Sequence, residues 1–115
     1  MKPMIALIVM VLVSMMAVNA MADASAEVAA GKAVYSQTCV ACHGADGKGA
    51  IPGVADLTKA DGALARSDDE LIRNINDGFQ SPGAVLAMPA KGGNPALTEA
   101  DIKSVLSYLC ATFGV

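Results

Sequence analysis

The sequence is poor in aromatic residues and contains a single histidine. Its 115 residues include no tryptophan, two tyrosines, two phenylalanines and three cysteines. Aromatic side chains supply much of the buried area of a small domain, so this chain has thin material for an independent core. Three cysteines also exclude a framework of several disulfides. We therefore expect a large apolar cofactor to fill the interior.

Two further absences narrow the class of protein. No segment alternates apolar and polar residues, so nothing predicts a β-sheet and an all-α fold is favoured. Basic residues are scarce, with 8 lysines and arginines in the whole chain, of which Lys2 lies in the N-terminal 22 residues. The segment after residue 22 therefore has seven basic and 11 acidic residues and a net charge of −4. Such an acidic surface argues against nucleic acid as a partner.

The one long hydrophobic run is confined to the N-terminus. "MKPMIALIVMVLVSMMAVNAMA" begins with a lysine, is apolar from Met4 to Val13 and ends in small residues at Ala20 and Ala22. A membrane-spanning helix needs roughly 20 apolar residues, more than this run holds. We predict a signal peptide over residues 1–22, cleaved after Ala22, and one domain over residues 23–115 with no stable membrane insertion. An uncleaved anchor is the alternative.

Three later segments have helical patterns, separated by loops rich in glycine and proline. Ser25, Ser67 and Thr98 stand where N-cap residues are expected. The expected helices span residues 24–37, 67–78 and 98–113, and the long loops span residues 44–53 and 80–97. The first helix should therefore deliver Cys39 at its end.

The last helix carries an apolar stripe that includes a cysteine. Cys110 continues the stripe of Ile102, Leu106 and Phe113. We expect a buried, inert thiol there, and an intermolecular disulfide is the alternative.

Cys39, Cys42 and His43 form a C-x-x-C-H pattern. A thioredoxin-type dithiol belongs to a βαβ unit, for which the sequence has no strands. A zinc site would have to recruit the distant Cys110, and His43 directly follows Cys42, which makes a shared tetrahedron difficult. Two thiols about one helical turn apart can instead each add to a vinyl group of a porphyrin, while the adjacent imidazole binds iron. The pattern predicts one covalent haem c, bound by Cys39 and Cys42, with His43 as an axial ligand.

A second axial ligand is found by elimination. Met88 is the only methionine beyond the N-terminal 22 residues, and Pro89 stiffens the backbone that follows it. We predict that Met88 binds the iron opposite His43, with Lys91 as the main competitor. The other ring nitrogen of His43 needs an acceptor, and the backbone carbonyl of Pro52, nine residues on, is the candidate. A plain turn proline is the alternative for Pro52.

The order of these motifs resembles the class I c-type cytochromes over essentially the whole chain beyond the leader. "MPAKGGNPALTEADIKSVLSYL" is similar to the C-terminal half of the bacterial cytochrome c-five group, and "SDDELIRNINDG" is similar to the monohaem domains attached to some haem-copper oxidases. The resemblance implies a small all-α fold, with helices and loops wrapped around one covalently attached haem. Several c-five relatives carry a further cysteine pair near the methionine loop. This chain has Asn94 and Pro95 there, so no such bridge is inferred.

The resemblance also implies a helix crossing. Gly31 and Tyr35 on the first helix should cross the last helix near Leu106 and Leu109, and the glycine should permit close contact.

His/Met ligation favours Fe(II) and implies a high-potential one-electron carrier, because a thioether stabilises the reduced iron. We expect a monomeric periplasmic protein that exchanges electrons with redox proteins such as a cytochrome oxidase, reductase or dehydrogenase. It is not expected to be an enzyme, since His43 leaves no other base that titrates near neutral pH. The rival is a peroxidase-like haem enzyme or gas-binding protein with an open sixth site. The uncharged loop around Val85 and Leu86 is the expected docking rim.

Overall fold

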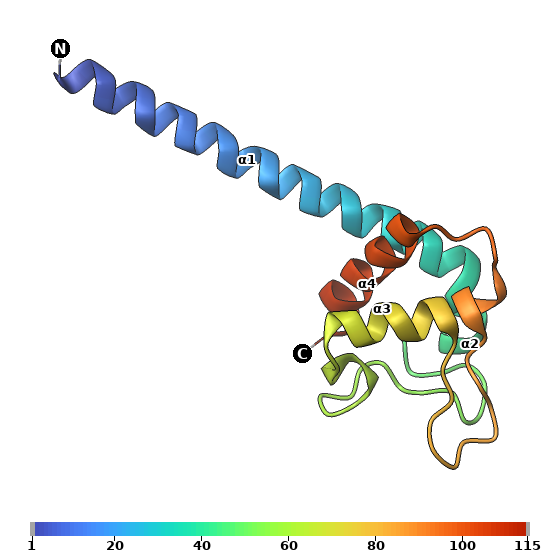
Figure 1. Ribbon diagram of the computed structural model, residues 1–115. Helices are drawn as coiled ribbons and strands as arrows, with labels where there is room; N and C mark the ends of the chain where they lie inside the picture. The colour runs from blue at the N-terminus through green and yellow to red at the C-terminus, as the bar shows by residue number, and fades with distance from the viewer. Residues whose placement is uncertain (1, 115) are drawn as a thin grey trace.

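The computed structural model of the chain is helical and describes residues 2–114, with the side chains of residues 2, 3, 6, 13, 14 and 17 left aside. Met1 of the predicted leader lies outside the described residues. Four α-helices are joined by loops that contain short helical turns (Figure 1). The helices are α1 (Lys2–Val34), α2 (Val40–His43), α3 (Asp68–Asp77) and α4 (Glu99–Phe113), and the turns are η1 (Tyr35–Cys39), η2 (Ala63–Ala65) and η3 (Ala90–Gly93).

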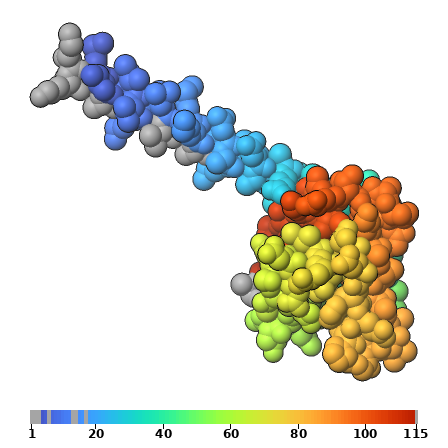
Figure 2. All heavy atoms as spheres, viewed as in Figure 1, coloured from blue at the N-terminus to red at the C-terminus, as the bar shows by residue number. Residues whose placement is uncertain are grey.

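Helix α1 projects far beyond the rest of the protein, as Figures 1 and 2 show. The radius of gyration is 18.6 Å and the molecule measures 70 × 30 × 23 Å. A compact chain of this length would have a radius of about 13 Å. The difference arises because the other elements gather around the C-terminal end of α1 alone.

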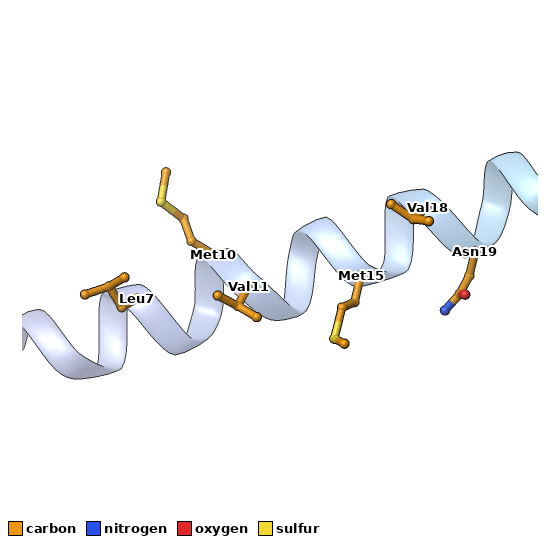
Figure 3. Close-up of a pocket in the computed structure, with 6 residues that line it drawn as sticks. All are labelled: Leu7, Met10, Val11, Met15, Val18 and Asn19. Carbon is orange, nitrogen blue, oxygen red and sulfur yellow. The ribbon is translucent and has the colours of Figure 1, made fainter.

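The N-terminal part of α1 extends away from the other elements of the described chain. The side chains that line a depression there all belong to this one helix, and Figure 3 shows them projecting from it with no second element beside them: Leu7, Met10, Val11, Met15, Val18 and Asn19. Every described side chain up to Glu27 is exposed, and Val28 is the first to be half-buried. No described helix is long and apolar enough to cross a membrane.

The predicted start of the first helix at residue 24 is wrong for the full chain. Helix α1 runs without a break through Ser25, which caps nothing. The physical reason is local: residues 4–30 contain no glycine or proline and many alanines, so no residue stops the helix. Ser25 gains a role as an N-cap only if the residues before it are removed.

Helices α1 and α4 cross at Gly31, which confirms the expected pairing. A β-carbon built on Gly31 would lie 1.9 Å from the carbonyl oxygen of Ser104 and 2.8 Å from the β-carbon of Tyr108. The closest contact is therefore at Ser104 and Tyr108, beside the expected Leu106 and Leu109. Only glycine allows the two backbones to approach this closely.

The core lies beside this crossing. Tyr35 is 2% exposed, and its ring centroid lies 5.3 Å from that of Tyr108 and 5.7 Å from that of Phe113. The central buried cluster consists of Tyr35, Leu57, Val105, Leu109 and Phe113. These contacts join the first and last helices to the loop that follows the C-x-x-C-H segment.

The stripe on α4 is buried as expected, except at one position. Ile102, Leu106 and Phe113 are buried, but Cys110 is exposed, so the prediction of a buried thiol is wrong. Cys110 follows Leu109 by about 100° around the helix, which puts it at the edge of the stripe. Partial burial and the charge of Asp68 still raise the pKa of its thiol.

The predicted N-caps of α3 and α4 and the predicted end of α3 at Gly78 are confirmed. The hydroxyl of Ser67 accepts a hydrogen bond from the Glu70 N–H at the start of α3. Thr98 and Asp101 form the full reciprocal capping box of α4. Gly78 ends α3 with φ 84°, in the left-handed region that favours glycine. No strand occurs in residues 2–114, where the only β pairing is an isolated antiparallel bridge between Phe79 and Met88.

Candidate functional site

The three residues of the C-x-x-C-H pattern lie on one short helical stretch. The π-helical turn η1 ends at Cys39, and α2 follows at once and ends at His43. Both thiols are free, with Cys39 half-buried and Cys42 exposed. Single π-turns inside helices are common at functional sites because they redirect the side chains that follow.

The loop after His43 folds back and fixes the end of α2. The Ala50 N–H donates to the carbonyl of Cys42 and the Gly49 N–H donates to the carbonyl of His43, each at 2.8 Å. The buried hydroxyl of Tyr35 donates to the carbonyl of Gly44. The backbone on both sides of His43 is therefore held by hydrogen bonds to loop and core.

The imidazole of His43 is kept neutral by its surroundings. Burial lowers its pKa, and this effect is larger than that of the hydrogen bond with the Ala55 backbone, which raises the pKa. Its Nδ1 is buried and has no hydrogen-bond partner among the described residues. A neutral imidazole keeps a nitrogen lone pair for a metal, so His43 has the chemistry of an iron ligand.

Pro52 occupies a tight turn beside this site. The Val54 N–H donates to the carbonyl of Ile51 at 3.1 Å, which places Pro52 and Gly53 at the two central positions. Gly53 has φ 90°, as a type II turn requires after proline. No hydrogen bond joins Pro52 to His43 in this structure, so the assignment of the Pro52 carbonyl stays a prediction.

The thiols do not have the properties of a redox dithiol. Burial and the neighbouring Cys42 raise the pKa of Cys39 to about 11. Reactive C-x-x-C motifs work by lowering the pKa of one thiol, which produces a thiolate at neutral pH. Nor do the described residues include a group of three or more Cys, His, Asp or Glu side chains placed to hold a metal ion. Neither the dithiol nor the zinc alternative gains support from this geometry.

Met88 stands at the base of a loop that leaves and rejoins the body. The Phe79 N–H donates to the Met88 carbonyl at 3.0 Å, and the Met88 N–H donates to the Phe79 carbonyl at 2.7 Å. Residues 80–87 form the loop between them, seen in gold and orange in Figure 1. The half-buried Met88 is therefore fixed at the closed end of the loop.

Contacts bring the Met88 segment to Thr38, which precedes Cys39, and to the loop that follows His43. On one side, the Asn94 side chain donates to the Thr38 hydroxyl at 3.4 Å, and a β-carbon on Gly92 would lie 2.9 Å from Thr38 Cγ2. On the other, a β-carbon on Gly53 would lie 3.7 Å from Leu86 Cδ1. The two segments, 45 residues apart in sequence, thus face one another.

Lys91, the competitor of Met88, lies in η3 three residues further on. It adopts a left-handed φ of 55°, the only positive φ of a residue other than glycine within the described chain. Such a conformation is uncommon outside glycine, asparagine and aspartate. The turn fixes the backbone just after Met88 and leaves both side chains on the same segment.

Sequence analysis missed two residues beside the site. The Arg66 guanidinium lies 4.6 Å from the centroid of the Phe79 ring, and it pairs with Glu70 at 2.8 Å. The spacing of Arg66 and Glu70 by four residues favours an ion pair, and that signal was available. No local pattern predicts that Phe79 pairs with Met88, because the bridge closes a loop.

Large exposed apolar side chains beyond α1 occur on the two facing loops. They are Ile51 at 42%, Leu86 at 47% and Val85 at 96% exposure. Together they form an apolar rim beside Met88 and the loop after His43.

Comparison with known proteins decides the family. Residues 26–109 match the family described as cytochrome c oxidase, cbb3-type, subunit III. Cytochrome c-555 of Chlorobaculum thiosulfatiphilum is 36% identical over 83 residues, which cover 72% of this chain and 93% of that protein. The chain is a class I c-type cytochrome.

Two other relatives show the breadth of the group. Cytochrome c-555 of Chlorobaculum tepidum is 35% identical over 83 residues, covering 72% of this chain and 74% of that protein. The cbb3-type oxidase subunit CcoP of Rhodobacter capsulatus is 32% identical over 85 residues, covering 73% of this chain but 29% of that protein. This cytochrome thus resembles both a small cytochrome c-555 and one part of a larger oxidase subunit.

Membership confirms the expected fold, a small all-α cytochrome c, and the expected cofactor, one covalently bound haem c. It also establishes the general role of electron carrier. The residues present fit the haem: two free thiols lie one helical turn apart, and the buried Nδ1 of the adjacent neutral imidazole has no protein partner.

Proposed function

We propose that this cytochrome is a periplasmic one-electron shuttle. Cys39 and Cys42 hold the haem through thioether bonds, and His43 and Met88 are its axial ligands. The observation that carries the proposal is that the Met88 segment contacts Thr38, directly before Cys39, on one side and Gly53, in the loop after His43, on the other. This packing supports Met88 as the second ligand independently of its being the only methionine beyond the leader.

Different residues of the chain bind the haem iron and support the segment that holds it. Bound haem c supplies one-electron exchange between Fe(III) and Fe(II). Met88 offers a soft thioether that favours Fe(II), and His43 offers a neutral imidazole whose backbone is held on both sides. The core cluster around Tyr35 anchors the helix that bears the attachment residues.

Ferric protein tests the assignment of Met88. A methionine on ferric haem produces a weak deep-red band, which reports the sulfur-to-iron bond. We expect the band in the wild type and its loss in Met88→Ala. A Lys91→Ala variant is the control, since it removes the competitor and should leave the band unchanged. Persistence of the band in Met88→Ala would rule out this ligand.

The apolar rim of Ile51, Val85 and Leu86 is the proposed docking face. Electron carriers need rapid release, and brief encounters bury less than about 1,200 Å². The net charge of −4 beyond the leader steers a basic partner, within a Debye length of about 8 Å at physiological salt. The partners we propose are respiratory redox proteins, such as a cytochrome oxidase, reductase or dehydrogenase.

Charge placed on the rim tests this face. Val85→Lys should slow electron exchange with the partner in stopped-flow measurements while the reduction potential stays nearly unchanged. Ala111→Lys adds the same charge on the exposed side of α4 and is the matched control. Equal rates in the two variants would move the docking face elsewhere.

Export by a cleaved signal peptide over residues 1–22 is part of the proposal. Its support is the exposure of every described side chain up to Glu27, so cleavage after Ala22 removes no residue of the buried core cluster. Mass measurement of the protein from the periplasm should give a chain that begins at Asp23. A mass that includes residues 1–22 would favour the uncleaved anchor.

A further inference from the structure

The hydrogen-bonded pair of Phe79 and Met88 closes the loop that carries the proposed iron ligand. Both backbone bonds of the pair are well within hydrogen-bond range, at 2.7 and 3.0 Å. The tip of the loop has hydrogen bonds of its own, from the Ala84 N–H to the Ser81 carbonyl and from the Gln80 side chain to the Ala84 carbonyl. Phe79 bonds the Met88 backbone at the base of the loop, so whatever fixes Phe79 contributes to the position of Met88.

Arg66, which lies between η2 and α3, holds the side chain of Phe79. Its guanidinium lies 4.6 Å from the ring centroid, within the range of a cation–π contact. Glu70 holds the same guanidinium through an ion pair at 2.8 Å, and both side chains are partly buried. The arginine is thereby oriented between a carboxylate on α3 and the face of the ring.

Gly78 lets the Met88 backbone lie against the end of α3. A β-carbon at this position would lie 2.9 Å from the Met88 carbonyl oxygen and 3.0 Å from the Ala90 nitrogen. Any side chain at residue 78 would push the Met88 segment away. Two neighbouring residues, Gly78 and Phe79, thus fix the same backbone through independent contacts.

We propose that Arg66 and Phe79 are positioning residues that clamp Met88 at the iron and keep the sixth site closed to other ligands. This inference rests on the proposed ligation by Met88 and adds the residues that control it. The clamp acts through the two backbone hydrogen bonds between Phe79 and Met88. Loosening the clamp should raise the rate at which Met88 leaves the iron.

Imidazole binding to the ferric protein measures that rate. The thioether of Met88 leaves the iron and an imidazole nitrogen takes its place, with no change in the number of electrons. Arg66→Ala should bind imidazole about fivefold faster, as expected for loss of one partly exposed cation–π contact. Phe79→Leu should give a similar increase, and the double variant should add little, because both substitutions remove the same contact.

Three controls make the result specific. Arg73→Ala removes an exposed arginine from α3, the helix that begins just after Arg66, and should leave the rate unchanged. Arg66→Lys keeps the charge but loses the planar stacking group, so its rate should lie between wild type and Arg66→Ala. In a Met88→Ala background, Arg66→Ala should have no effect, since no methionine has to leave.

The outcomes distinguish failure of the clamp from failure of the proposed ligation by Met88. Loss of the deep-red band in Met88→Ala, with unchanged imidazole rates in Arg66→Ala and Phe79→Leu, would overturn the clamp alone. Persistence of the band would overturn the ligation and the clamp together. Hydrogen exchange at the Met88 amide needs no added ligand, and it should quicken in Arg66→Ala and in Arg66→Lys; unchanged exchange would contradict the clamp.

Discussion

The segments that carry His43 and Met88 are held in different ways. His43 ends a helix, and the loop that follows returns within seven residues to bond the carbonyls of Cys42 and His43. Met88 belongs to a loop, and its backbone is held by Phe79 and by the approach of Gly78 at the end of α3. The proposed ligand His43 is thus held at the end of a helix, whereas the proposed ligand Met88 is held within a loop.

The difference between the two segments also shows where a rival function, that of a haem protein with an open sixth site, would arise. A ligand fixed by local structure stays in place while the rest of the fold moves. A ligand fixed by a few contacts across a loop is the one that opens first, because such regions have the lowest local stability. An open sixth site would therefore arise on the Met88 side.

Removal of His43 and removal of Met88 should differ most strongly, in the amount of haem that stays attached to the chain. His43→Ala should yield little or no holoprotein, because the attachment segment loses its iron ligand next to both cysteines. Met88→Ala should remain folded with its haem attached, since Cys39 and Cys42 are untouched. Haem content per chain after extraction with acidified acetone measures both. Equal yields of the two variants would contradict the contrast.

A side chain at Gly31 should break the crossing that supports the His43 side. Gly31→Ala pushes a β-carbon into the Ser104 carbonyl and should lower the free energy of unfolding by about 3 kcal/mol. Gly83→Ala is the control on the Met88 side. It has open space but φ 79°, so it should cost about 1 kcal/mol. Denaturant unfolding compares them, and similar losses would refute close packing at Gly31.

Tyr35→Phe should weaken the hold on the His43 segment by about 1 kcal/mol, the usual net value of one hydrogen bond. The variant loses the bond to the Gly44 carbonyl and keeps the buried ring. Tyr108→Phe is the control, since the Tyr108 hydroxyl makes no hydrogen bond with the described residues. Unfolding in denaturant should separate the two variants, and indistinguishable curves would count against this bond.

The same tyrosine should make stability depend on alkaline pH. Burial raises the pKa of Tyr35 from 10.0 to about 12. The folded chain holds this proton more tightly than the unfolded chain, so the contribution is complete below pH 10 and is lost as the pH rises from 10 to 12. Wild type should therefore lose more stability over this range than Tyr35→Phe. Parallel losses would show that Tyr35 does not titrate in this way.

Cys110 should give the smallest effect on stability. Its thiol is exposed, so Cys110→Ser should leave the free energy of unfolding nearly unchanged. A thiol reagent under denaturing conditions should label one cysteine per chain in the holoprotein, because the other two are bonded to haem. Mass spectrometry counts the labels. Three labels would contradict covalent attachment at Cys39 and Cys42.

Elements with signals inside a few residues could be predicted from the sequence. The caps at Ser67 and Thr98 predicted the starts of α3 and α4, as the structure confirms. The spacing of Cys39, Cys42 and His43 predicts the haem attachment segment in the same way, and that assignment stays a prediction. The start of α1 was not predicted, because Ser25 can cap a helix only when the residues before it are not helical. In the full chain those residues continue the helix. The exposure of Cys110 was missed because the stripe predicts a face but not how far the neighbouring helices cover it.

The Met88 side of the site was only half predictable. Met88 was found by elimination, which identifies a residue without saying what holds it. The bridge from Phe79 to Met88 and the contact of Arg66 with the ring join segments that no periodic pattern connects. Such contacts become visible only when the chain is folded.

Carbon monoxide binding tests the central claim most directly. If His43 and Met88 both bind the iron, the visible spectrum of the reduced protein should be unchanged by carbon monoxide, and Met88→Ala should show the change expected of an open site. A wild-type spectrum that shifts with carbon monoxide would contradict the electron-carrier assignment. It would place this chain with peroxidase-like or gas-binding haem proteins.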